Sequence, residues 1–326
     1  MITMNNSGLL HALLLDGSGG AKALTAEEAD RWDAQDGTLW LHFDYSASQT
    51  VDWIRNESHL DSVSREFLLA EGTRPRVTSI NNGLLLALRG VNLNPNSDPE
   101  DMIGVRVWAN ESLIITTIRK TLLSIADICV ALEGGNGPQN SSEFVVDLAR
   151  RLISRMGPTL ENLEEILADL EEQILETGDS EVRRQLSSIR RDSIVLRRYL
   201  SPQREAMYHL YDERVSWLKE KDRMHSREVT DHLLRYIENL DSIRERAMVI
   251  HEELTSNLSE QINSRMYVLS LITTIFLPLG FLTGLFGINV GGIPGSDSKF
   301  AFIVFVGLLV IIALVLLMLF KRKRWM

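Results

Sequence analysis

The stretch that decides the fold is 266-MYVLSLITTIFLPLGFLTGLF-286, then 287-GINVGGIPG-295, and, after four polar residues, 300-FAFIVFVGLLVIIALVLLMLF-320. Neither apolar run contains a charged residue. As an α-helix each run would be about 31 Å long, which is enough to cross the hydrocarbon core of a bilayer. We therefore predict a transmembrane hairpin with an external loop at 287–299 and a second transmembrane helix at 300–320.

The charges around this hairpin predict its orientation. The tail at 321–326 carries Lys321, Arg322, Lys323 and Arg324, and Arg265 stands just before the first run. Because basic residues stay on the cytoplasmic side, both termini are expected in the cytoplasm of a multi-pass protein. The single cysteine and the absence of a secretory signal at the start predict a cytoplasmic body. The net charge of −10 despite the basic tail makes that body acidic, which argues against a nucleic-acid partner.

Residues 1–140 alternate short apolar runs with turn signals, which predicts a cytoplasmic α/β domain with a mixed sheet. Two of the runs, 84–91 and 113–118, are continuously apolar, as expected for strands covered on both faces. Helices are expected at 48–58 and 61–71. The predicted strands are 9–15, 38–44, 77–80, 84–91, 102–109 and 113–118.

Residues 141–225 form a predicted helical hairpin region. Glycine and proline divide it into helices at 141–156, 159–176 and 180–200, the last ending at Ser201-Pro202. The 159–176 segment is acidic and the 180–200 segment is rich in arginine, so the two arms carry opposite charge. Two readings stand: ion pairs between the arms, or an acidic tip that attracts cations.

A long helix is predicted from 226 to 286, a stalk that continues as the first transmembrane helix. Apolar residues recur there at steps of three and four, as in an amphipathic helix or a coiled-coil seam. The helix is either a lever that moves its transmembrane end or a rigid stalk. The seam residues are Leu233, Ile237, Leu240, Ile243, Ala247, Ile250, Leu254, Leu258 and Ile262.

Two transmembrane helices per chain cannot enclose an aqueous path, so a pore would require several subunits. One face of the first helix is small, polar and flexible, which suits either a pore wall or close packing between helices. Neither apolar run contains an acidic residue or a histidine, so a divalent cation would keep most of its water and meet neutral oxygens such as that of Asn289. The face comprises Asn263, Met266, Ser270, Thr273, Leu277, Gly280 and Gly284.

The motif Gly287-Ile288-Asn289 resembles the Gly-Met-Asn signature of the CorA superfamily of divalent cation transporters. The longer string 287–295, and Thr73-Arg74-Pro75-Arg76-Val77 in the body, resemble its ZntB zinc-transporter branch. The resemblance implies a homopentamer with an α/β/α cytoplasmic funnel and a selectivity ring at residues 287–289. It also implies a protein of the bacterial inner membrane that transports zinc without a resident cofactor, and it leaves coupling to protons open. The pore-lining positions that it implies are Asn263, Met266, Leu277, Gly280 and Gly284.

Other readings stay open beside zinc transport. A magnesium or cobalt channel gated by cytoplasmic divalent cations has the same fold, and a membrane sensor that transports nothing is a different class. No phosphate-binding loop or nucleophile triad indicates an enzyme. His225, Glu228 and His232 share a helix face, a loose metal site at best. Near the membrane end, Glu252, Glu253 and Glu260 are either cation ligands or solvated stalk charges.

Overall fold

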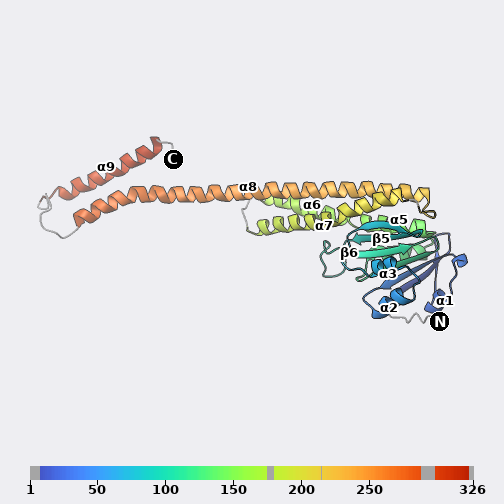
Figure 1. Cartoon of the computed structure of the whole chain (residues 1–326). Coiled ribbons are helices and arrows are strands. Elements are labelled where there is room, and N and C mark those ends of the chain that lie inside the picture. The colour runs from blue at the N-terminus through green and yellow to red at the C-terminus, as the bar shows by residue number, and fades with distance from the viewer. Residues whose placement is uncertain (1–7, 175–179, 214, 288–297, 323–326) are drawn as a thin grey trace. The chain divides into compact units, whose positions relative to one another are not determined.

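The computed structural model describes residues 8–174, 180–213, 215–287 and 298–322, and its elements are labelled in Figure 1. The chain divides into two units, residues 1–251 and 252–326, which we describe separately. The first unit contains a sheet domain followed by helices, and the second contains the two apolar segments.

A seven-stranded mixed sheet organises the first unit, in the order β2-β1-β3-β7-β6-β5-β4. Neighbouring strands are antiparallel except β3 and β7, which run parallel with Leu39 opposite Leu113 and Asp44 opposite Ile118. The mixed sheet that the sequence predicts is therefore present. The strands are β1 (Leu9–Leu15), β2 (Ala21–Ala23), β3 (Thr38–Asp44), β4 (Arg76–Ile80), β5 (Gly83–Gly90), β6 (Ile103–Ala109) and β7 (Leu113–Ile118).

Helices cover both faces of the sheet (Figure 1). On one face, Leu41 and Phe43 of β3 pack with Ile54 of α2 (Ser48–Asn56) and Leu68 of α3 (Ser62–Leu69). On the other face, Trp40 of β3 contacts Phe144 of α5 (Ser141–Ser154), which packs beside α4 (Leu123–Glu133). Because successive side chains of β3 point to opposite faces of the sheet, they pack into a hydrophobic core on each face, as an α/β/α layer arrangement requires. The sequence reading missed β2, α4, and the short helices α1 (Ala26–Asp30) and η1 (Ala34–Asp36).

The turn between β4 and β5 forms hydrogen bonds with the segment that connects two long helices. Asn81 and Asn82 both have positive φ, 48° and 62°, the conformation of a tight hairpin turn that asparagine tolerates. The Asn82 side-chain oxygen accepts hydrogen bonds from Ser216, and its backbone carbonyl accepts one from the Trp217 indole at 2.8 Å. This turn therefore fixes the segment that leads from α7 (Ser180–Asp212) into α8 (Glu220–Gly287).

One predicted helix end was wrong and one was confirmed. The helix expected at 141–156 ends at Ser154, shortly before Gly157-Pro158. Gly157-Pro158 then opens α6 (Gly157–Ile174), where a proline in the first turn loses no helical hydrogen bond. Pro202 lies inside α7, which continues to Asp212. A proline inside a helix destabilises it by about 3 kcal/mol. Burial of apolar side chains in the following turns offsets this loss. The apolar side chains that become buried beyond it are Ala206, Met207 and Leu210.

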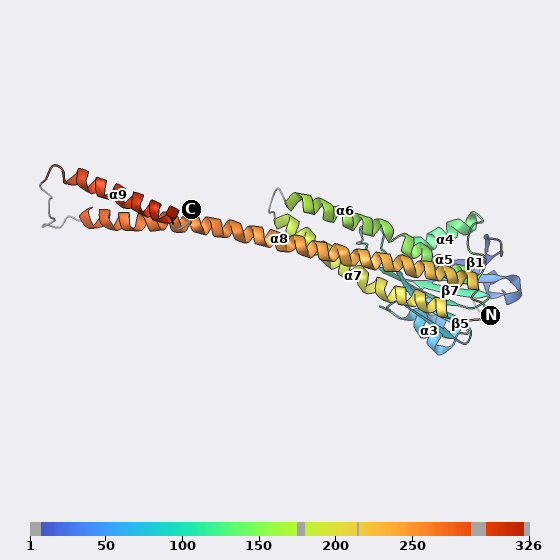
Figure 2. The same cartoon turned by 90° about the horizontal axis from the view of Figure 1, so that it is seen from above.

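The long helix is present, with α8 beginning at Glu220 rather than Ser226. Its predicted seam is buried from Leu233 to Leu254, but Leu258 is only partly buried and Ile262 is 60% exposed. In the first unit Leu233, Leu240 and Ile243 are fully buried, and α6 and α7 run beside α8 in Figures 1 and 2. One described ion pair joins each arm to α8: Glu171 of α6 to Arg246, and Arg197 of α7 to Asp241. Two further pairs, Arg184 with Glu181 and Arg191 with Asp192, lie within α7 itself.

The second unit contains the end of α8 and the helix α9 (Ala301–Arg322). Both are long and apolar enough to span a membrane, and neither has its apolar window buried. The rings of Phe286 and Phe305 meet at a centroid distance of 5.1 Å, so the two helices contact each other near the loop. The two predicted apolar helices are therefore present, and α9 begins one residue later than expected.

A candidate cation path along α8

The seven residues predicted to line a pore all lie within α8. At 3.6 residues per turn their spacing of three and four positions places them in one stripe along the helix. All seven are exposed in the described chain, with Met266 at 57% and Leu277 at 70%. Gly280 and Gly284 have no atom within 4 Å of the position that a Cβ would take. The described part of this chain therefore leaves the stripe uncovered.

The side chains of α8 that are partly covered lie on the other side of the helix. They follow the same periodicity, offset by half a turn from the predicted pore stripe. Because α9 is the other described helix of this unit, we assign their burial to it. The pore stripe thus faces away from α9. The partly covered residues are Tyr267, Leu271, Ile275, Pro278, Leu279 and Leu282.

Polar atoms on the stripe are neutral, and the threonine among them is bonded within its own helix. The Thr273 hydroxyl donates to the carbonyl of Leu269 at 2.9 Å, and Thr274 beside it donates to Ser270 at 2.8 Å. A hydroxyl that donates inward leaves its lone pairs free to accept hydrogen bonds from water. Such a wall can meet the water shell of a cation but offers no carboxylate to replace that shell.

The signature itself is only partly within the described residues. Gly287 is the last residue of α8 and has open space around it. Ile288 and Asn289 lie outside the described residues, so the proposed selectivity ring stays a prediction.

The described residues hold no assembled metal site. In 8–174, 180–213, 215–287 and 298–322, no group of three His, Cys, Asp or Glu side chains could hold a metal ion. Glu252, Glu253 and Glu260 are exposed along α8. The loose histidine site is not assembled either, because the His225 ring binds Glu228 at 3.2 Å while the His232 ring lies against Tyr236. The three glutamates remain a predicted source of cation attraction.

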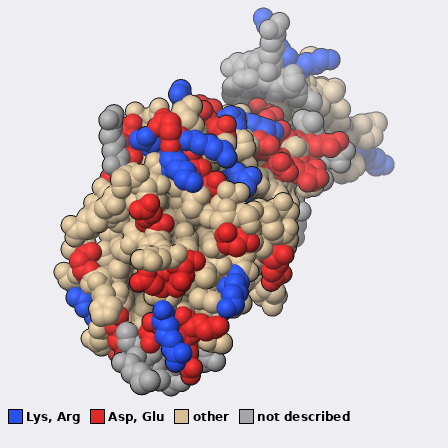
Figure 3. Space-filling view, turned by 90° about the vertical axis from the view of Figure 1, so that its right-hand side faces the viewer, with Lys and Arg blue, Asp and Glu red and all other residues tan. Residues whose placement is uncertain are grey.

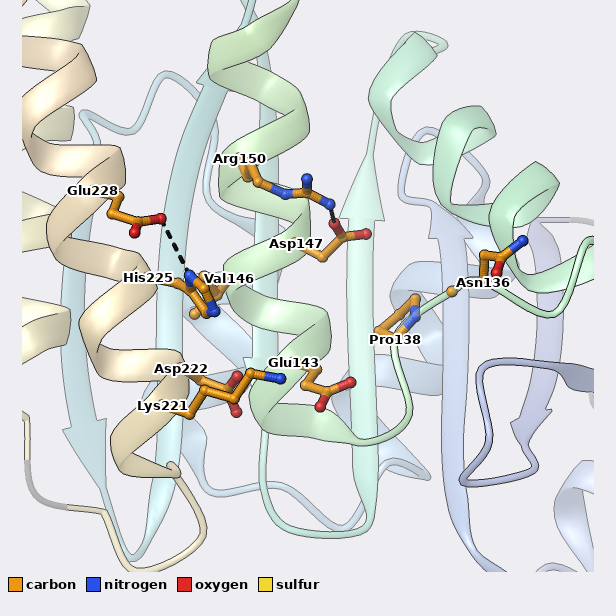
Figure 4. A pocket seen from close by; sticks show the side chains of 11 residues that line it. Asn136, Pro138, Glu143, Val146, Asp147, Arg150, Lys221, Asp222, His225 and Glu228 are labelled. Carbon is orange, nitrogen blue, oxygen red and sulfur yellow. Dashed lines mark hydrogen bonds and ion pairs between the residues drawn. The ribbon is translucent and has the colours of Figure 1, made fainter.

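A pocket of about 360 Å³ lies in the first unit between α5 and the start of α8 (Figure 4). It has several acidic lining residues, but their carboxylates already have partners. Asp147 pairs with Arg150 and Arg151, and the buried Asp222 accepts a hydrogen bond from the Ser142 hydroxyl. Figure 4 also shows the contact between His225 and Glu228 at its edge. These pairings leave the pocket without a free set of cation ligands among its described side chains.

Acidic side chains are scattered over the one face of the body that Figure 3 shows. In Figure 3, acidic side chains form separate patches with basic side chains between them on the face in view. An attractive field for cations on this face would therefore be local. The prediction that an acidic body concentrates cations gains no support from this view.

Sequence reasoning missed two buried polar side chains, Arg106 of β6 and Gln203 of α7. Arg106 interrupts an apolar strand, which was the available signal. Gln203 follows Pro202, where the sequence reading had ended the helix, so no periodicity marked it as buried.

Comparison with known proteins extends over nearly the whole chain. Residues 35–322 match the family described as CorA-like Mg2+ transporter protein. The zinc transport protein ZntB of Pectobacterium carotovorum is 36% identical over 323 residues, which cover 99% of this chain and 98% of that protein. The divalent cation transporter CmaX of Pseudomonas aeruginosa is 37% identical over 323 residues, 98% of this chain and 97% of that protein.

The fold agrees with a solved structure of the same group. The structure of full-length CmaX superimposes with a TM-score of 0.87 at 36% sequence identity, covering 99% of this chain and 100% of that one. The family groups transporters rather than enzymes, in agreement with the absence of catalytic motifs. With the mixed sheet, the long α8 and the two apolar helices, these matches establish that the chain belongs to the CorA-like Mg2+ transporter family.

Proposed function

We propose that this chain transports a divalent metal ion, with zinc as its main substrate, across the inner membrane. Its relatives ZntB and CmaX are named as a zinc transport protein and a divalent cation transporter. The observation that carries the proposal is the uncharged stripe of α8 from Asn263 to Gly284, which is exposed on the side away from α9. Such a stripe can form the wall of a pore when several copies of α8 surround a common axis.

In this proposal five copies place their stripes around one pore, and residues 287–289 form its outer ring. The ion travels with most of its water, because the stripe offers amide, hydroxyl and carbonyl oxygens and no carboxylate. Met266 and Leu277 act as apolar constrictions, and the pore is closed when water leaves the space between them. The basic residues around the hairpin place both termini in the cytoplasm.

Metal uptake into proteoliposomes that contain the purified full-length chain tests this proposal. We expect 65Zn2+ uptake down its gradient, and at least a tenfold loss in the variant Asn289→Ala, because the outer ring would lose its amide oxygens. Asn257→Ala, on the exposed surface of α8 outside the apolar run, is the matched control. An unchanged flux in Asn289→Ala would remove the ring assignment, and no flux of any divalent ion would favour the membrane sensor.

A magnesium or cobalt channel is the second candidate, because the matching family is described by Mg2+. Competition among zinc, magnesium, cobalt and nickel in the same vesicles decides between the two. Zinc that is displaced by a small excess of magnesium would assign this chain to the second class. An imposed pH gradient, inside acidic or inside alkaline, tests proton coupling, since a passive path responds to it only through the membrane potential.

A further inference from the structure

Two carboxyl groups meet where the loop between β5 and β6 reaches α7. Glu100 belongs to the loop, Asp192 belongs to α7, and their side chains lie within hydrogen-bonding distance of each other. Glu100 is partly buried, and the Asp192 side chain is only 16% exposed. Ionised carboxylates accept hydrogen bonds but cannot donate them. The two groups therefore form a hydrogen bond only when one of them carries a proton.

The backbone of the loop holds Glu100 in place. The Asn92 N–H donates to the carbonyl of Pro99 at 3.2 Å, which closes the loop just before Glu100. The Asn94 side chain donates to the carbonyl of Thr121 at 3.0 Å, which ties the loop to the segment after β7. An ordered loop therefore presents the Glu100 carboxyl group to α7.

Asp192 has fewer hydrogen-bond donors than an ionised carboxylate requires. Its Oδ2 atom accepts from the Ser188 hydroxyl at 3.3 Å, while its Oδ1 atom is buried and has no hydrogen-bond partner within the described residues. The Arg191 Nε atom lies 3.8 Å from Oδ1, too far for a hydrogen bond, and the Arg191 side chain is 75% exposed. A buried carboxylate oxygen without a donor is destabilising, and a proton shared with Glu100 reduces that loss.

The electrostatic surroundings favour retention of a proton. Burial raises the pKa of Glu100, and the negative charges of Asp192 and Asp98 raise it further. Burial likewise raises the pKa of Asp192, and the charge of Asp98 acts in the same direction. Ser188, Arg191 and the hydrogen bond with Glu100 oppose this second shift. Glu100 is thus the better hydrogen-bond donor of the two, and the proton belongs to the pair rather than to either residue.

We propose that Glu100 and Asp192 share one proton and form a pH-sensitive contact between the β5–β6 loop and α7. With the proton, a carboxylic acid donates to a carboxylate and the pair carries one negative charge. Without the proton, two carboxylates face each other beside Asp98, and the loop and the helix repel each other. This inference is separate from the proposed transport, because no residue of the α8 stripe takes part.

Urea unfolding of the full-length chain in detergent between pH 5 and pH 8 tests the pair. The unfolded chain holds these protons only up to the ordinary pKa values, 4.5 for Glu100 and 3.8 for Asp192, whereas the folded pair holds its proton to higher pH. The pair therefore stabilises the fold in acid, and this contribution is lost as the pH rises through the folded-state pKa. Each variant is compared with wild type at the same pH, so that other titrating groups cancel.

Glu100→Gln replaces the shared proton by an amide N–H at every pH. We expect its urea midpoint to lie closest to wild type at pH 5 and to exceed wild type increasingly up to pH 8. Asp192→Asn should shift in the same direction, and the double variant should gain less than the sum of the two, because both single changes remove the same shared proton. Glu66→Gln, at an exposed glutamate of α3, should follow wild type at each pH.

Amide hydrogen exchange provides a local measurement that does not depend on global unfolding. After correction for the intrinsic pH dependence of exchange, residues 92–101 should lose protection towards pH 8 in wild type and keep it in Glu100→Gln. A midpoint difference between Glu100→Gln and wild type that is constant with pH overturns the proposal, as do effects that add fully in the double variant.

A titration with magnesium chloride at pH 8 separates a shared proton from a bound cation. Sodium chloride at matched ionic strength is the reference. Equal responses to the two salts support the shared proton. If Mg2+ raises the midpoint of wild type but not that of Glu100→Gln or Asp192→Asn, the pair holds a metal ion and the proposal is wrong.

Discussion

The side chain of Gln203 in α7 binds both backbone groups of Arg89 in β5. Its Oε1 atom accepts from the Arg89 N–H at 2.7 Å, and its Nε2 atom donates to the Arg89 carbonyl at 3.1 Å. The amide thus pairs with the strand as a neighbouring strand would. Gln203 is 1% exposed and follows Pro202 directly, so this contact holds α7 against the sheet where the helix lacks one of its own hydrogen bonds.

Replacing Gln203 should therefore destabilise the first unit. In Gln203→Leu two partly buried backbone groups lose their partners, and we expect the free energy of unfolding to be about 1–3 kcal/mol lower than in wild type. The urea midpoint of the purified chain, followed by tryptophan fluorescence, measures this. Gln185→Leu, at an exposed position of the same helix, should stay within about 0.5 kcal/mol. Equal midpoints for the two variants would show that the clamp contributes little.

Stability should fall in mild acid because of His42. Burial lowers the pKa of His42 to about 3, with the charge of His11 as a second cause, and its Nδ1 atom lies 2.7 Å from the Thr116 hydroxyl. The unfolded chain binds a proton at the ordinary pKa of 6.5. The stabilisation is thus complete above pH 6.5 and declines below it, by up to about 1.4 kcal/mol per pH unit.

Urea unfolding at several pH values between 7 and 5 checks this dependence. His42→Leu should flatten the slope, because the variant has no imidazole to protonate on unfolding. His209→Gln, at an exposed histidine, should keep the wild-type slope. If His42→Leu loses stability with falling pH as steeply as wild type, other groups cause the acid sensitivity.

The ion pair between Arg246 of α8 and Glu171 of α6 is bidentate. Arg246 Nε lies 3.0 Å from Oε1, and Nη2 lies 2.7 Å from Oε2. Both side chains are partly exposed, so the coupling energy should be about 0.5–1 kcal/mol and weaken in high salt. A double-mutant cycle with Arg246→Met and Glu171→Gln measures it in urea. Arg246→Lys should recover only part of the coupling, because an ammonium cannot form both bonds. A coupling of zero at low salt would contradict this contact.

Bulk on the predicted pore stripe should block transport. Gly284 of α8 and Gly307 of α9 both have open space around the position of a Cβ, so leucine fits at either position within one chain. Gly284→Leu should lower metal uptake at least tenfold because its side chain would enter the shared path, while Gly307→Leu should remain near wild type. Uptake into proteoliposomes at equal protein content compares them. Similar losses in both variants would place the path elsewhere.

Local patterns of apolar residues predicted most helices and strands of this chain. The short apolar run at 38–44 and the continuous apolar run at 113–118 predicted β3 and β7 with their observed ends, because strands covered on both faces are apolar at successive positions. The steps of three and four along 233–250 predicted the buried side of α8. The same reasoning failed at Pro202, where a local breaker is overridden by tertiary burial and by the Gln203 contact.

The sequence by itself determined the class of the protein: two uncharged runs long enough to span a bilayer, a long amphipathic helix before them, and the Gly287-Ile288-Asn289 motif. These features follow from the composition of each segment and from the spacing of its apolar residues. Both depend only on residues that are close together in the sequence. The tertiary structure decided what depends on residues far apart in sequence. It placed Phe286 of α8 against Phe305 of α9, joined Gln203 to Arg89 across 114 positions, and buried Arg106 of β6 among the described residues. Packing brings such groups together, and no local pattern encodes which partner a buried polar group will find.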